Sequence, residues 1–112
     1  MHVEEYKFGS ITILGKTYKY DIEARWNSEV LEWQREKSHI IDIEDVKRAI
    51  KEIPELIIIG TGEHGLANVT DNARKEILSN GIGLIINKTE DAVKAFNKQK
   101  NKKIIGLFHL TC

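Results

Sequence analysis

Residues 56–65 read LIIIGTGEHG, a continuous apolar run that ends among three glycines. Such a run, directly after Pro54 and Glu55, indicates a β-strand that is buried on both faces. The glycines also match the G-x-G-x-x-G pattern of loops that bind the pyrophosphate of a dinucleotide. The fold therefore depends on what surrounds this stretch, and the function depends on what its glycines do.

Two similar apolar runs follow along the chain. Residues 82–86 read IGLII and residues 104–110 read IIGLFHL, and both are predicted to be buried strands. The segments between the three runs carry apolar residues at helical spacing. Three strands separated by two helices predict a right-handed and largely parallel β-α-β-α-β unit.

The ends of the two intervening helices carry recognisable capping residues. Thr70 is expected to cap the first and Thr89 the second, with Gly81 just beyond the end of the first. Glu90 and Asp91 favour the positive end of the second helix dipole. The side chains expected to face inward are Ala73, Ile77, Leu78, Ala92, Val93 and Phe96.

The preceding part of the chain changes from strands to a helix. Alternating polar and apolar residues around Gly15 and Lys16 predict a β-hairpin with strands near residues 10–14 and 17–23. Residues 25–39 show no clear period and are expected to form a loop. Its two tryptophans, at positions 26 and 33, are expected to cover one edge of the core.

After this loop, Asp42 should cap a helix that Pro54 ends. Apolar residues at helical spacing support this helix, namely Ile43, Val46, Ile50 and Ile53. The hairpin is expected to join the sheet or pack against it.

The length, charge balance and cysteine content of the chain limit the classes of protein to which it can belong. A chain of 112 residues is expected to form one domain, residues 1–112. Lys+Arg and Asp+Glu number 17 each, so no net field favours nucleic acid or an anionic membrane. No signal peptide and no membrane-spanning run is expected. The single cysteine, Cys112, excludes an intrachain disulfide and favours the cytoplasm.

The glycine loop has three interpretations. A dinucleotide loop opens its helix at the third glycine, whereas residues 66–69 intervene here before Thr70. Asn87 and Lys88 also occupy the place of the acid that binds a ribose. A dinucleotide site is therefore disfavoured, and no cofactor is expected. A sharp exit from a crowded strand and a small-anion loop both stay open.

Two further groups of residues invite a functional interpretation. Trp33, Arg35 and His39 could line an anion pocket, or form a surface ion pair beside a surface histidine. His109 and Cys112 could supply metal ligands or an activated thiolate, or only core packing. Two ligands do not make a metal site, so no metal is expected.

The combined motifs resemble a known family. W-x-R with a following histidine, P-x-L-I-I-G-T-G, T-E-D-A-V-K-A-F-N and G-L-F-H-L-T-C are similar to the MTH nine-three-eight-like domain, over about residues 8–112. This former domain of unknown function has eukaryotic members that include an adipogenesis-associated protein and a mitochondrial assembly factor for respiratory complex I.

The resemblance implies a three-layer α/β sandwich with a mixed central sheet. It implies no established enzymatic activity. The positions to which it directs attention are Trp33, Arg35, His39, Gly60, Thr61, Gly62, Thr89, Asn97, His109 and Cys112.

Two functional hypotheses follow. The first is a non-catalytic binding or assembly module, whose partner is another protein or a second copy of the chain. The second is a small enzyme or anion-binding protein, with a pocket between residues 33–39 and 60–65. Its candidate residues are Trp33, Arg35, His39, Gly60, Thr61, Gly62 and His109.

Overall fold

The computed structural model describes residues 1–100 and 102–112, and within them a mixed five-stranded sheet forms the centre. Its strands are β4 (Ile22–Arg25), β5 (Val30–Glu32), β7 (Leu56–Thr61), β9 (Gly83–Asn87) and β10 (Ile104–His109). They lie in the order β5-β4-β10-β7-β9. β7, β9 and β10 are parallel, whereas β4 runs antiparallel to β10 and to β5. The predicted parallel unit and mixed sheet are confirmed.

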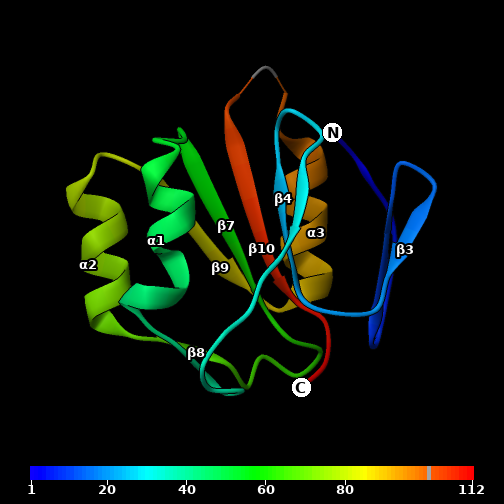
Figure 1. Ribbon diagram of the computed structural model, residues 1–112, viewed down its shortest axis with the longest axis horizontal. Helices are drawn as coiled ribbons and strands as arrows, with labels where there is room; N and C mark the ends of the chain where they lie inside the picture. Colours follow the sequence, from blue (N-terminus) through cyan, green and yellow to red (C-terminus); the bar gives the residue numbers. More distant parts are fainter. Residues whose placement is uncertain (101) are drawn as a thin grey trace.

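Helices cover both faces of this sheet, as Figure 1 shows. α1 (Ile43–Lys51) and α2 (Asp71–Ser79) lie on one face, and α3 (Thr89–Lys98) lies on the other. The chain passes from β7 to the edge strand β9, and then back past β7 to β10. Because the two crossovers run in opposite directions across the sheet and are both right-handed, α2 and α3 lie on opposite faces. In the described part of the chain, no helix is long and apolar enough to span a membrane.

The predicted hairpin belongs to a separate antiparallel sheet. This sheet contains β1 (Val3–Lys7), β2 (Ser10–Ile13) and β3 (Lys16–Tyr18). It packs against the outer side of α3 instead of joining the central sheet (Figure 1). The hairpin is confirmed, although its second strand ends at Tyr18, short of the predicted residue 23. A parallel pair, β6 (Ile40–Ile41) and β8 (Asn68–Val69), links the loop before α1 to the loop before α2.

Two hydrophobic clusters hold the layers together, one on each face of the sheet. The cluster under α1 and α2 includes Trp33, Val46, Ala49, Ile57, Ile59, Ala73, Ile77, Ile105 and Leu107. The cluster between the sheet, α3 and the small sheet includes Val3, Ile11, Ile13, Ile22, Ile58, Ala92, Phe96 and Phe108. Alternate residues of β7 and β10 enter opposite clusters, which explains why these strands are apolar throughout.

Several local predictions are wrong. Leu78, expected to face inward, is 56% exposed. The strand at 82–86, expected to be buried, lies at the sheet edge with half-buried side chains. The predicted loop at 25–39 contains β5. Thr89 does not cap α3: Lys88 occupies that position, and Thr89 is the first helical residue. The predicted caps Asp42 and Thr70 are confirmed.

Candidate functional site

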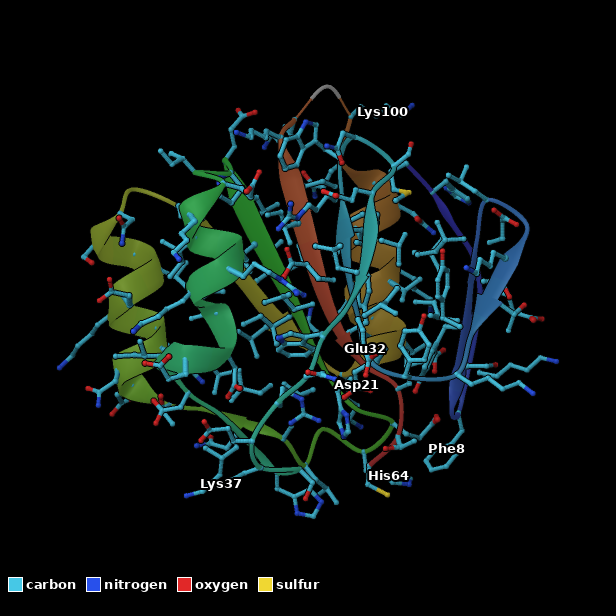
Figure 2. The ribbon with its side chains drawn as sticks, viewed as in Figure 1. Phe8, Asp21, Glu32, Lys37, His64 and Lys100 are labelled. Carbon is cyan, nitrogen blue, oxygen red and sulfur yellow. The ribbon has the colours of Figure 1, made fainter. Side chains whose placement is uncertain are left out.

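The carboxyl ends of β7 and β10 lie side by side, because Thr61 pairs with His109 in the parallel ladder. Around them lie the turn at 8–9, residues 39–40, the loop at 61–66 and the tail at 109–112. The tail contacts two of these segments: Gly9 N–H donates to Leu110 C=O, and Glu63 N–H donates to Thr111 C=O. We call this end of the molecule the rim. Figure 2 shows Phe8, Lys37 and His64 there.

A polar cluster lies at the rim, formed by Asp21, Arg35 and His109. An Arg35 Nη2 hydrogen donates to Asp21 Oδ2 across 2.9 Å, and His109 Nδ1 lies 2.7 Å from the same oxygen. The other oxygen, Oδ1, accepts from the Leu110 N–H at 2.8 Å. Arg35 Nη1 donates to the carbonyls of Lys37 and Ser38. The cluster therefore ties the start of β4, the loop before α1 and the end of β10 together.

The Nδ1 atom of His109 lies between two partners, 2.7 Å from Asp21 Oδ2 and 2.8 Å from Arg35 Nη2. With a hydrogen on Nδ1 the ring donates to Asp21, and without one Nδ1 accepts from Arg35, so both tautomers fit these distances. Nε2 forms no hydrogen bond within the described residues. This is the geometry of a histidine oriented by a carboxylate, which serves either proton transfer or chain anchoring.

The environment of Asp21 lowers its pKa. Burial alone would raise that pKa, but hydrogen bonds from His109, Arg35 and the Leu110 amide favour the charged form and outweigh burial. Because the folded-state pKa is below the unfolded value, the stabilising contribution of Asp21 is present above the unfolded pKa of about 3.9. It is lost as the pH falls through the folded-state pKa.

Asp21→Asn should therefore cost about 1–3 kcal/mol of unfolding free energy at neutral pH, since a charged acceptor is lost. The difference from wild type should shrink as the pH falls below about 4, where Asp21 of the unfolded chain becomes protonated, and vanish as the pH falls through its lower folded-state pKa. Urea unfolding at a series of pH values measures both. The exposed Glu36→Gln variant is the control and should follow the wild-type curve. A difference for Asp21→Asn that stays constant down to about pH 2 would contradict this assignment.

Thr89 and the glycines of the rim lock the end of β7. The Gly62 N–H donates to Thr89 Oγ1 at 2.8 Å, and the Thr89 hydroxyl donates to the His109 C=O. A Cβ at Gly60 would lie 2.8 Å from Thr89 Oγ1, so only glycine lets the start of α3 approach this strand. Thr89 fails to cap α3 because its oxygen is engaged in this bridge. These contacts, and the positive φ of Gly62, fit a sharp exit from a crowded strand, and the small-anion loop stays a prediction.

The structure brings most of the candidate residues to this end of the molecule. The Arg35 guanidinium lies over the Trp33 ring at 5.2 Å, and Trp33 is buried. His39 is exposed, but its C=O accepts from the Asn68 N–H two residues after Leu66. Cys112 is exposed, and in the described residues no group of three His, Cys, Asp or Glu side chains could hold a metal ion. A ligand pocket among these residues stays a prediction.

Asp21 is the residue that the sequence did not indicate. It lies 88 residues from His109 along the chain, and only the antiparallel register of β4 against β10 brings them together. Its position directly before a strand is the sole local signal. The structure has a hollow of about 390 Å³ between β1 and α3, which reaches the rim at Phe8 and Glu63, and one of about 370 Å³ beside Trp26 and Lys103.

The fold and the rim define a class: a small α/β sandwich with a carboxylate–histidine–arginine cluster where its parallel strands end. The family model described as protein of unknown function (DUF498/DUF598) matches residues 3–109. The chain belongs to this family, and the resemblance to the MTH nine-three-eight-like domain is confirmed.

Solved structures agree with this assignment. The chain is 25% identical to the conserved hypothetical protein PH1505 from Pyrococcus horikoshii OT3, with 100% of both chains covered and a TM-score of 0.90. It is also 25% identical to the protein MT938, covering 99% of this chain and 98% of that one, with a TM-score of 0.85. An outer membrane protein from Bartonella henselae shares the fold at 19% identity, 98% and 94% coverage and a TM-score of 0.84. Comparison with curated proteins gives no match.

Proposed function

We propose that this protein is a non-catalytic binding module of the assembly type, which presents its rim to another protein in the cytoplasm. The observation that carries the proposal is that the hydrogen bonds of the polar cluster are made largely within the chain, although Arg35 Nε and His109 Nε2 have no partner among the described residues. Both terminal nitrogens of Arg35 donate within the chain, and the Thr89 hydroxyl donates to His109. A catalytic site needs such groups aimed at a substrate, whereas here they join chain segments.

Exposed apolar side chains on the same rim support a protein partner. Phe8 is 56% exposed, Leu66 is 55% exposed and Ile40 is 39% exposed. Aromatic and aliphatic side chains are the usual anchors of protein interfaces, and a rigid platform lowers the entropy cost of binding. The cluster under them would supply that rigidity.

The alternative, a small enzyme or anion-binding protein, has weaker support. The N–H of its candidate residue Gly62 already donates to Thr89. The one buried side-chain nitrogen without a partner among the described residues is Arg35 Nε. A single such nitrogen offers an anion much less than a cradle of free amides.

The double variant Phe8→Ser and Leu66→Ser tests the binding module. Immobilised wild-type protein should capture a stoichiometric partner from a native lysate, and the double variant should reduce that capture at least about tenfold, because interface anchors typically contribute more than about 1 kcal/mol each. Leu14→Ser is the matched control: it removes a 63% exposed leucine from the opposite turn of the same small sheet.

Two results would count against the binding module. One is a wild-type chain that captures no stoichiometric partner. The other is a partner that the double variant retains as well as Leu14→Ser does. Circular dichroism and thermal unfolding of each variant show that the fold is intact, since surface substitutions at exposed positions change stability little.

A further inference from the structure

The outer edge of β9 is where the central sheet ends, and no described residue pairs with it. Gly83–Asn87 contains no charged residue and no proline, and its register with β7 is continuous without a bulge. Proteins usually protect an exposed sheet edge with a charged residue, a proline or a β-bulge. At the other end of the sheet, β5 is only three residues long and ends in the exposed Glu32. The β9 edge is thus the one suited to strand pairing.

The backbone of β9 shows which groups point outward. Gly83 N–H donates to Glu55 C=O, and Asn87 C=O accepts from the Thr61 hydroxyl, so residues 83 and 87 face β7. Peptide groups alternate in direction along a strand. The N–H and C=O groups of Leu84 and Ile86 therefore point away from the sheet.

Apolar side chains surround this open edge. Leu84, Ile85 and Ile86 are only half-buried, although the sheet carries helices on both faces. Leu78 of α2 is 56% exposed. The hydrogen bond that Lys47 of α1 donates to Glu44, followed by the charges of Glu44 and Glu76, raises the pKa of Lys47, so Glu76 lies on the side of α2 toward α1. By helical periodicity Leu78 lies on the flank of α2 away from Glu76, which is the side of the β9 edge.

We propose that the partner of this edge is a second copy of the chain, paired antiparallel through β9 about a twofold axis at Ile85. Leu84 of each copy then lies opposite Ile86 of the other, and their outward N–H and C=O groups form four hydrogen bonds. The two central sheets become continuous, and Leu78, Leu84, Ile85 and Ile86 of each copy cover one another. We call these four residues the edge patch.

The charges of the edge strand fit a second copy. Gly83–Asn87 carries no charged side chain, so an antiparallel pair of two β9 strands brings no like charges together.

Oligomeric mass tests the pairing. Light scattering after gel filtration should give wild-type protein a mass of twice 12.8 kDa. Leu78→Lys should raise the dissociation constant of the dimer at least about tenfold, because it places a charge in the apolar contact. Leu14→Lys is the matched control, since it replaces another exposed leucine outside the edge patch and should leave the dimer unchanged.

A second variant and a second measurement separate pairing from folding. Ile86→Pro removes an N–H that points away from β7, so it should weaken the dimer while the β7–β9 ladder stays intact. Amide exchange should show Leu84 and Ile86 protected in the dimer and exchanging fast in the Leu78→Lys monomer, with Ile85 protected in both.

A wild-type chain that stays monomeric up to about 1 mM would overturn the pairing, as would a dimer that Leu78→Lys and Ile86→Pro leave unchanged. Neither result bears on the proposed binding module, whose variants Phe8→Ser and Leu66→Ser lie on the rim. A dimer disrupted by the rim variants instead of the edge variants would also overturn it.

Discussion

Gly62→Ala is expected to lower the free energy of unfolding by about 3 kcal/mol or more. Gly62 has a φ of +104°, a conformation that costs a residue with a Cβ about 1–2 kcal/mol. The added Cβ would also lie 2.6 Å from the carbonyl oxygens of both Thr111 and Cys112. The tail must then move, and the hydrogen bond from Glu63 N–H to Thr111 C=O is lost.

Gly81→Ala separates the two parts of this effect. Gly81 has a φ of +76°, but nothing lies within 4 Å of the Cβ position. Its replacement should cost only the backbone term, about 1–2 kcal/mol. Urea unfolding of both variants measures the difference, which reports the contact between the tail and the loop at 61–66. Equal losses for the two variants would mean that the tail does not hold this loop.

The sequence predicts the centre of the sheet better than its margins. The apolar runs of β7 and β10 indicate strands covered on both faces, and both strands are confirmed. The run IGLII has the same apolar pattern, because helices cover both faces of its strand too. Hydrophobic periodicity does not show that this strand lacks a neighbouring strand on one side. Leu78 shows the same limit: its spacing is helical, but it lies on the flank of α2 beyond the last strand.

Tertiary contacts determine how the residues of the site hydrogen-bond to one another, and these contacts cannot be seen in the sequence alone. Thr89 has the pattern of a helix cap, yet its hydroxyl bridges Gly62 and His109 because α3 approaches the end of β7 there. Arg35 and His109 are recognisable as candidates, but their common partner Asp21 becomes visible only through strand register. Local patterns therefore predict which residues reach the rim and not how they bond to one another.

Glu23→Gln is expected to cost about 3–5 kcal/mol, because it removes a buried charge whose partner stays buried. The Glu23 side chain is 1% exposed and that of Arg25 is 8% exposed. Glu23 Oε2 accepts from Arg25 Nε at 2.8 Å, and Oε1 accepts from Arg48 Nε at 3.0 Å. The bond from Arg48 joins β4 to α1. The alternating pattern of residues 22–25 suits a strand with one face in water, whereas α1 covers that face.

Glu29→Gln provides the matched comparison, since Glu29 Oε1 also accepts from Arg25, at 2.8 Å from Nη1, but its side chain is 47% exposed. It should cost at most about 1 kcal/mol, as surface ion pairs do. A double variant, Glu23→Met with Arg25→Met, should recover most of the stability, because replacing a whole buried pair by apolar side chains avoids the uncompensated charge. Thermal and urea unfolding of the wild type and the three variants measures these differences. If Glu23→Gln costs no more than Glu29→Gln, the bonds between β4 and α1 contribute little, and apolar packing alone holds α1 in place.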